Sequence, residues 1–274
     1  MSNSGLSGDI AEAYRSFGVA GPYKAFEPAE LDGMADRVMR EMGAQNFNLL
    51  SGRNRHLDWD LAQRLSAAPA IREAAFRLLG PRLALWRTQF FVGRRGQGLR
   101  WHQDEYRTLL RDPFNHISIH LAITEAVPDN CVFVLPGSHR MDRAELARQG
   151  FHFLQGTDED AYGAPNYWRD ASRPTNDLKM TLRPGEFFVF HPGLVHASKD
   201  MTGLPLAPRP PSLMSDLARR VSRRLVRARD IVSMPRLAFG LRLTVAENEI
   251  FPTAFAQTLP RPDHAVMIEA GVPA

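Results

Sequence analysis

Apolar residues recur at helical spacing along the first 80 residues of the chain. Residues 9–18 and 28–42 place apolar side chains three and four positions apart, as on one face of a helix. Residues 58–79 repeat the pattern in two pieces that divide near Pro69, since proline interrupts a helix. The spacing therefore predicts N-terminal helices over about residues 1–80.

From residue 83 onward the pattern changes to short strand-like apolar runs, separated by Gly, Pro and Asn. These runs are residues 83–93, 116–126, 131–137, 178–193 and 237–247. Helices followed by many short strands are typical of an antiparallel barrel or jelly roll with helical support. We expect a mainly β fold in which residues 1–274 form one domain and the jelly-roll core spans about residues 83–250.

Two stretches interrupt the strand pattern. Residues 138–176 are polar and mixed, and we interpret them as a long excursion between strands. Residues 205–236 begin proline-rich and continue as an arginine-rich helix, with Leu213, Leu217 and Val221 on one face. This insertion is either a surface helix with a solvated basic face, or a lid or docking element for an anionic partner such as a carrier protein. A membrane-surface helix is a further alternative.

Composition excludes several protein classes. The 274 residues are 44% hydrophobic and 23% charged, which is ordinary for a soluble globular protein. No run is long and apolar enough for a transmembrane helix, and the N-terminus shows no signal-peptide pattern. Cys131 is the only cysteine, so an internal disulfide is excluded. We expect a cytoplasmic protein without stable membrane insertion, and a net charge of +4 gives no reason to predict a nucleic-acid partner.

Candidate metal ligands follow the glycine-rich stretch GRRGQG. His102 and Asp104 stand two positions apart after a strand-like run, so their side chains point to the same face. His196 follows a second buried run in RPGEFFVFHPGLVHAS. Two histidines and one carboxylate form the facial triad that binds Fe(II) and leaves coordination positions open. His191 is the alternative third ligand, although it opens a Pro-Gly turn. The two-residue spacing of His102 and Asp104 also occurs in surface ion pairs that bind no metal.

An arginine completes the candidate chemistry. Arg242 lies within the apolar strand LAFGLRLTV, and arginines are rarely buried unless they are paired. Its planar guanidinium suits the far carboxylate of 2-oxoglutarate, a cosubstrate that chelates iron. Arg236 is the next candidate for this role. The alternative is an edge-strand arginine that faces water.

Five motifs occur in the order seen in the phytanoyl-CoA dioxygenase superfamily, and over residues 83–247 the chain most resembles its bacterial branch of non-haem iron chlorinating enzymes. The motifs are WRTQFF (86–91), WHQD (101–104), PGSH (136–139), RPGEFFVF…HAS (183–198) and RLAFGLR (236–242). The resemblance implies a double-stranded β-helix (a cupin-like jelly roll) that uses Fe(II), 2-oxoglutarate and O₂.

The resemblance also implies roles for individual residues. Iron ligands would be His102, Asp104 and His196, and the 2-oxoglutarate clamp would be Arg242. Gln89 matches a polar position near the cosubstrate, and His120 stands where chlorinating relatives have an aromatic residue beside it. Both of these also suit polar residues satisfied inside the barrel.

Two departures from the chlorinating enzymes bear on the reaction. Those enzymes carry a small residue in place of Asp104, which leaves room for chloride on iron, so hydroxylation is expected here. The segment between His196 and Arg242 is longer than usual because the arginine-rich stretch is inserted there. We expect a hydroxylase acting on a small metabolite or on a CoA- or carrier-linked substrate in bacterial secondary metabolism. Alternatives are a desaturase, cyclase or halogenase of the same family, or a non-enzymatic jelly-roll binding module.

Overall fold

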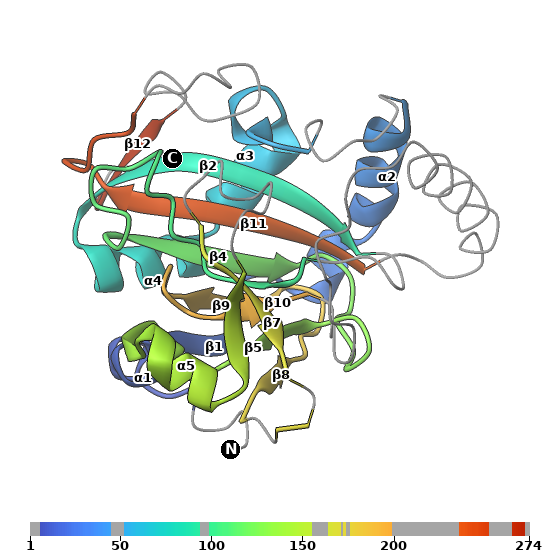
Figure 1. Cartoon of the computed structure of the whole chain (residues 1–274). Helices are drawn as coiled ribbons and strands as arrows, with labels where there is room; N and C mark the ends of the chain where they lie inside the picture. The colour runs from blue at the N-terminus through green and yellow to red at the C-terminus, as the bar shows by residue number, and fades with distance from the viewer. Residues whose placement is uncertain are drawn as a thin grey trace, which may run out of the picture.

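The computed structural model of the chain is shown in Figure 1. It describes residues 6–44, 52–93, 99–154, 164–170, 172–173, 176–198, 236–251 and 265–271. The predicted arginine-rich insertion at 205–236 lies outside the described residues, apart from Arg236 at its end. No helix among the described residues combines the length and the apolar character that a membrane span requires.

The N-terminal helices form where the apolar spacing predicts them. Their bounds, with the short 3-10 helices written η, are α1 (Ile10–Phe17), η2 (Pro28–Leu31), α2 (Met34–Ala44), η3 (Arg55–Leu57), α3 (Asp60–Ser66) and α4 (Pro69–Leu79). Asp9 caps α1, because its side chain accepts hydrogen bonds from the backbone of Ala11 and Glu12. Gly18, at φ +72°, ends the same helix in a left-handed conformation that suits glycine.

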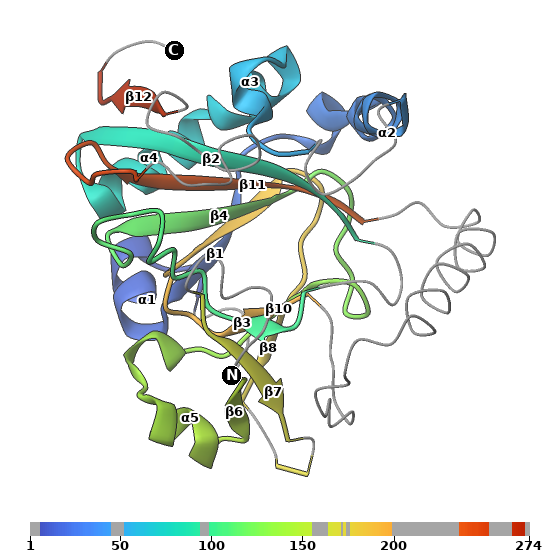
Figure 2. The same ribbon diagram turned by 45° about the horizontal axis from the view of Figure 1, so that its top comes forward.

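The described strands form two six-stranded sheets in which every pair is antiparallel. The larger sheet contains β1 (Val19–Lys24), β9 (Glu186–Phe190), β4 (His116–Ala122), β11 (Arg236–Val245), β2 (Arg82–Gly93) and β12 (Val266–Glu269), in that order. The smaller sheet contains β6 (Phe151–Leu154), β7 (Asn166–Arg169), β3 (Trp101–His102), β10 (His196–Ala197), β5 (Val132–Val134) and β8 (Leu178–Met180). Figure 2 shows α3 and α4 on one side of β2, β11 and β4, and strands of the smaller sheet on the other. The predicted mainly β, jelly-roll fold with N-terminal helices is confirmed.

Strand alternation divides the larger sheet into two chemically different faces. The outer face packs against the helices and is apolar; its residues include Leu83, Leu85, Phe90, Ile117, Ile119, Leu121, Leu237, Phe239, Leu241 and Leu243. The inner face is turned toward the smaller sheet and combines apolar residues such as Phe188 and Phe190 with buried polar ones. The polar residues include Arg87, Gln89, His116, Ser118, His120, Arg236 and Arg242. Because successive side chains point to opposite faces, the same three central strands build both the hydrophobic core and a polar interior.

The stretch at 138–176, which the sequence predicts to be a long excursion between strands, contains regular elements of its own. Within its described residues it contains η4 (Ser138–Arg140), α5 (Arg143–Arg148) and the pair β6–β7, and β7 pairs with β3. Phe151 packs edge-on against Trp101 with ring centroids 4.9 Å apart. The runs FHFL and NYWR are each only four residues long, so their strand conformation follows from this cross-strand pairing rather than from a pattern of their own.

The larger sheet also extends beyond the predicted range of 83–250. β1 pairs with β9, and β12 pairs with the outer side of β2. β1 contains the Gly21-Pro22 bond and a shift in register, both of which hide it from strand patterns.

Candidate metal centre

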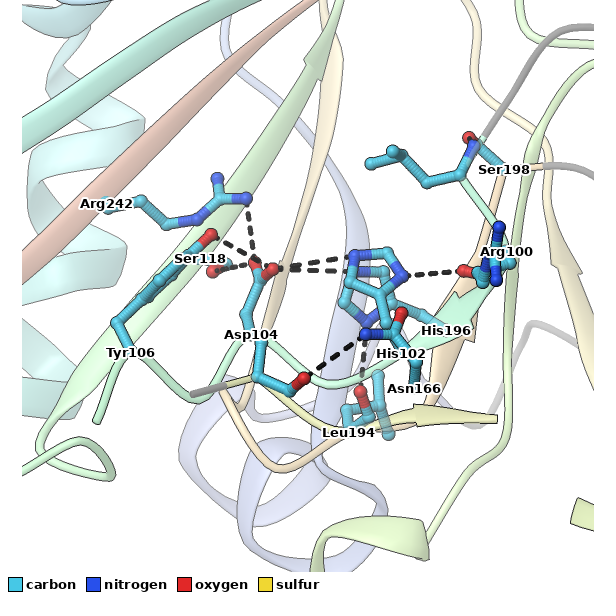
Figure 3. Close-up of polar contacts among 12 residues, drawn as sticks. Arg100, His102, Asp104, Tyr106, Ser118, Asn166, Leu194, His196, Ser198 and Arg242 are labelled. Atoms are coloured by element: carbon cyan, nitrogen blue, oxygen red, sulfur yellow. Dashed lines mark hydrogen bonds and ion pairs between the residues drawn. The ribbon is translucent and has the colours of Figure 1, made fainter. Parts of the chain in front are cut away.

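Two strands of the smaller sheet bring the predicted ligands together. His102 in β3 is the direct cross-strand partner of His196 in β10, and their rings lie 4.2 Å apart. Asp104 follows β3 by two residues, and its backbone N–H donates to the carbonyl of Pro192 at 2.8 Å. Local spacing therefore places two ligands, and strand pairing supplies the third, as Figure 3 shows.

The donor atoms of this trio converge on one point. Asp104 Oδ1 lies 3.7 Å from His102 Nε2 and 4.0 Å from His196 Nε2. One ligand atom from each of the three residues lies within 4.8 Å of the others. Ligands that bind one metal ion at about 2.1 Å stand roughly 3 to 4 Å apart, so these residues fit a shared ion.

Hydrogen bonds set the orientation of both histidine rings. His102 Nδ1 lies 2.7 Å from the carbonyl of Arg100, and His196 Nδ1 lies 2.9 Å from the carbonyl of Leu194. A carbonyl only accepts, so both Nδ1 atoms carry hydrogen and both Nε2 lone pairs face Asp104. Burial lowers the pKa of His196 to about 3, so that ring stays neutral, as a metal ligand must.

The carboxylate of Asp104 is held from three sides. Arg242 Nη2 lies 2.7 Å from Oδ2, the Ser118 hydroxyl donates to Oδ2 at 2.9 Å, and the Tyr106 hydroxyl donates to Oδ1 at 3.1 Å. Burial opposes ionisation of this side chain. The charge of Arg242, together with His196, His102 and the Ser118 hydrogen bond, outweighs burial and holds the pKa of Asp104 well below its usual range. Asp104 is therefore an ionised, oriented carboxylate, and Arg242 is its direct ion-pair partner.

Two cavities meet at the trio. The larger cavity has a volume of about 240 Å³, and its lining includes His102, Asp104, Arg87, Gln89 and Asn166. The smaller cavity has a volume of about 40 Å³, and its lining includes His102, His196, His120, Arg236 and Ser198. Arg242 borders both.

The smaller cavity contains a donor suited to an anion. Arg236 is 5% exposed, and its Nη1 donates to the carbonyl of Asn130. Its buried Nε has no hydrogen-bond partner among the described residues. His120 lies on the same cavity, and burial together with Arg236 keeps its pKa well below the ordinary value, so this ring is neutral. A ligand carboxylate in this cavity would supply the acceptor that Arg236 lacks.

Of the remaining predicted residues, Gln89 and His120 line these cavities and His191 does not. Gln89 lines the larger cavity and His120 the smaller one. His191, the alternative ligand, lies outside the trio, where its Nδ1 accepts the backbone N–H of Gly193 at 3.0 Å. Sequence reasoning missed Ser118. The alternation of polar and apolar residues in HISIHLA was a usable signal, because it places Ser118 and His120 on one face.

The phytanoyl-CoA dioxygenase (PhyH) sequence model matches residues 14–204, more than half of the chain. The chain belongs to the phytanoyl-CoA dioxygenase family. The predicted resemblance is thus confirmed. Family membership and the His102–Asp104–His196 trio make this family member a non-haem iron oxygenase. Among curated proteins, none matches it.

Solved structures share the fold of this phytanoyl-CoA dioxygenase family member. The non-haem α-ketoglutarate-dependent carbocyclase SnoK from nogalamycin biosynthesis has 15% identity and a TM-score of 0.62, over 98% of both chains. The epimerase SnoN, solved with Fe³⁺, α-ketoglutarate and a nogalamycin compound, has 17% identity and a TM-score of 0.61, over 95% of this chain and 90% of its own. CytC3 with Fe(II) and α-ketoglutarate has 21% identity and a TM-score of 0.57, over 94% of this chain and 86% of its own. At these identities the likeness supports the fold, and the ligands of SnoN and CytC3 agree with the cofactors predicted from the sequence.

Proposed function

We propose that the protein is an Fe(II)- and 2-oxoglutarate-dependent dioxygenase that hydroxylates an unactivated C–H bond. The substrate is a small metabolite, free or linked to CoA or a carrier protein, in bacterial secondary metabolism. The observation that carries this proposal is the convergence of His102, Asp104 and His196 on one point, with both Nε2 lone pairs free to bind.

In this proposal the trio holds iron, and the bound Fe(II) with 2-oxoglutarate supplies the activation of O₂ for attack on the C–H bond. The chain's own contribution is to fix the ligand set. Arg242, Ser118 and Tyr106 keep Asp104 ionised and prevent it from rotating away. The larger cavity borders His102 and Asp104 and therefore suits the substrate.

Asp104 favours hydroxylation over chlorination. A carboxylate in this position occupies the site that a halide would need and supplies the same negative charge. Desaturation, ring closure and epimerisation remain alternatives within the family, since SnoK is a carbocyclase and SnoN an epimerase. A non-enzymatic binding module is the alternative outside the family's chemistry, and it predicts no succinate release from 2-oxoglutarate with any substrate.

For the far carboxylate of 2-oxoglutarate, the geometry favours the second of the two predicted arginines. Arg242 is already matched by Asp104 at 2.7 Å. Arg236 lies on the smaller cavity beside His196, with a buried donor that lacks a partner among the described residues. We therefore propose Arg236 as the clamp and Arg242 as the residue that positions Asp104.

The two arginines are distinguished by anaerobic titration of the Fe(II)–2-oxoglutarate charge-transfer band. Arg236→Gln should raise the apparent 2-oxoglutarate dissociation constant by roughly two orders of magnitude, the typical loss for a bidentate charged contact, while Fe(II) affinity stays unchanged. Arg242→Gln should instead weaken Fe(II) binding, because Asp104 loses its partner. If Arg242→Gln weakened 2-oxoglutarate binding and Arg236→Gln weakened Fe(II) binding, Arg242 would be the 2-oxoglutarate clamp. Succinate release with screened substrate pools then tests oxygenation.

A further inference from the structure

We propose that the larger cavity binds a substrate with a carboxylate or phosphate group, and that Arg87 holds this anionic group. The inference rests on the proposed function, because it takes the trio of His102, Asp104 and His196 as the reaction centre. It adds the chemical class of the substrate and a residue that determines specificity.

Most of the charged side chains that line the larger cavity are positive. In the described part of its lining, the charged side chains other than histidine are Arg53, Arg87, Arg100, Arg242 and Asp104. Asp104 is matched by Arg242 at 2.7 Å. Three further arginines therefore face a space in which the described lining offers no second carboxylate.

A bulge in β2 turns Arg87 into this cavity. In the pairing of β2 with β11, Leu85 lies opposite Leu243 and Arg87 opposite Arg242, so Trp86 is the extra residue. Trp86 packs edge-on against Tyr106, and Arg87 lines the cavity, so two successive side chains serve the inner face. Bulges commonly re-aim a side chain beside a functional site.

The position of Arg87 sets where the anion would lie relative to the iron ligands. Its guanidinium carbon lies 5.1 Å from the centre of the Tyr106 ring, and the Tyr106 hydroxyl donates to Asp104 at 3.1 Å. Arg87 is 6% exposed, so an oxyanion beside it would be shielded from water. An anionic group held here would place a neighbouring part of the same molecule against His102 and Asp104.

Arg87 lies opposite a second arginine, Arg242, on the adjacent strand, and Asp104 offsets the charge of that neighbour. A guanidinium offers several N–H donors in a planar fork, so Arg87 can bind an oxyanion and still keep a partner within the protein.

Apolar and amide groups complete the wall. Phe91, Leu99 and Ala164 line the cavity beside the amides of Gln89 and Asn166. The cavity of about 240 Å³ lies below the size typical of sites for drug-sized ligands. The occupant that fits is a small molecule, or the end of a longer one, with an apolar body and an oxyanion.

The test compares charged and neutral probes of one shape. The full chain is loaded anaerobically with Fe(II) and saturating 2-oxoglutarate, and binding of benzoate, phenyl phosphate and benzamide is measured by calorimetry. We expect benzoate or phenyl phosphate to bind about tenfold tighter than benzamide, or more, because only the anions form a charge-assisted contact with Arg87. The tighter of the two anions identifies the carboxylate or the phosphate as the preferred group.

Matched variants assign the preference to one arginine. Arg87→Gln should abolish the preference for the anion, and Arg87→Lys, which keeps the charge without the fork, should retain part of it. Arg64→Gln serves as the control, because Arg64 is exposed on α3 and is not among the residues that line the cavity, and it should keep the full preference. Equal binding of benzamide and the anions, or a preference that survives Arg87→Gln, would overturn the proposal.

The experiment also separates this inference from the proposed function. If the Fe(II)–2-oxoglutarate band forms but the probes show no preference, the anionic substrate is rejected and the dioxygenase assignment stands. If the band does not form in the wild-type chain, the proposed function fails first, and the inference falls with it. Should Arg87→Gln fail to form the band, Arg87→Lys provides the test, and a full preference for the anion in that variant would contradict the role of Arg87.

Discussion

The outer and inner faces of the larger sheet are built by the same strands but obey different physical rules. In β4, Ile117, Ile119 and Leu121 pack against the helices, while Ser118 and His120 point toward the smaller sheet. The outer face gains stability by removing apolar surface from water. The inner face buries polar groups, which is unfavourable unless each finds a partner. One face therefore stabilises the fold, and the other is suited to chemistry.

The ion pair between Asp104 and Arg242 shows this difference most clearly. Their side chains are 5% and 9% exposed, and a buried pair rarely stabilises a fold more than apolar residues of similar volume would. An apolar replacement would fold well but would provide no ligand. We infer that the pair is retained for the metal centre. The following predictions test whether stability and metal binding separate along the two faces.

Truncation on the outer face should produce the largest loss of stability. Phe239 is fully buried, and its ring lies 4.6 Å from that of Phe90. Phe239→Ala should lower the free energy of unfolding by about 3–5 kcal/mol, because it leaves a cavity. Urea unfolding of the metal-free protein measures this loss. Below the unfolding transition, Fe(II) affinity should stay close to wild type, and a large drop in that affinity would show that the two faces are coupled.

Breaking the ion pair on the inner face should lower the free energy of unfolding slightly less than Phe239→Ala does. A second substitution should restore much of that stability. Arg242→Met leaves the Asp104 carboxylate buried without its cation, which typically costs about 3–5 kcal/mol, less whatever Ser118 and Tyr106 still contribute. The double variant Arg242→Met with Asp104→Leu should regain much of this stability in the metal-free protein. A double variant no more stable than Arg242→Met would show that the pair does stabilise the fold.

The pH dependence of stability should belong to the inner face. Burial lowers the pKa of His116 and of His196 to about 3, whereas an unfolded histidine titrates near 6.5. Between these values the unfolded chain binds protons that the folded chain does not, so stability falls as pH is lowered from about 6.5 toward 3. Each histidine contributes up to about 1.4 kcal/mol per pH unit. His116→Phe should flatten the slope of metal-free urea unfolding between pH 4 and 6 by nearly one proton, and an unchanged slope would contradict this assignment.

The smallest expected effect comes from one hydroxyl. Ser118→Ala removes the 2.9 Å hydrogen bond to Asp104 and should weaken Fe(II) binding roughly tenfold, as is usual for partners of metal ligands. The matched control is Ser66→Ala, because the Ser66 hydroxyl donates to the carbonyl of Ala62 within α3. The control should leave Fe(II) affinity unchanged in a metal titration. Equal Fe(II) affinities in the two variants would show that the Ser118 hydroxyl does not contribute to metal binding.

The elements that were predictable from the sequence rest on local spacing. His102 and Asp104 are placed by strand alternation, and Pro69 divides two helices where the apolar pattern does. Arg236 and Arg242 share one face of β11, so spacing alone does not show which of them meets Asp104. That distinction depends on a tertiary contact, the 2.7 Å pair with Arg242. The turn of Arg87 into the cavity depends on a bulge that leaves no mark in the sequence.

The hairpin β6–β7 shows a second limit. Its runs are short and mixed, and they become strands because β3 and Trp101 provide a surface to pair with. Patterns report what a segment can bury by itself, whereas this pair depends on its neighbours.

The central claim is that His102, Asp104 and His196 bind one iron ion that also holds 2-oxoglutarate. Anaerobic titration of the wild-type chain with Fe(II) in saturating 2-oxoglutarate tests it most directly. The charge-transfer band should rise to saturation at one Fe(II) per chain, and His196→Ala should abolish it although the variant still folds. A His196→Ala protein that retains the full band would contradict the account.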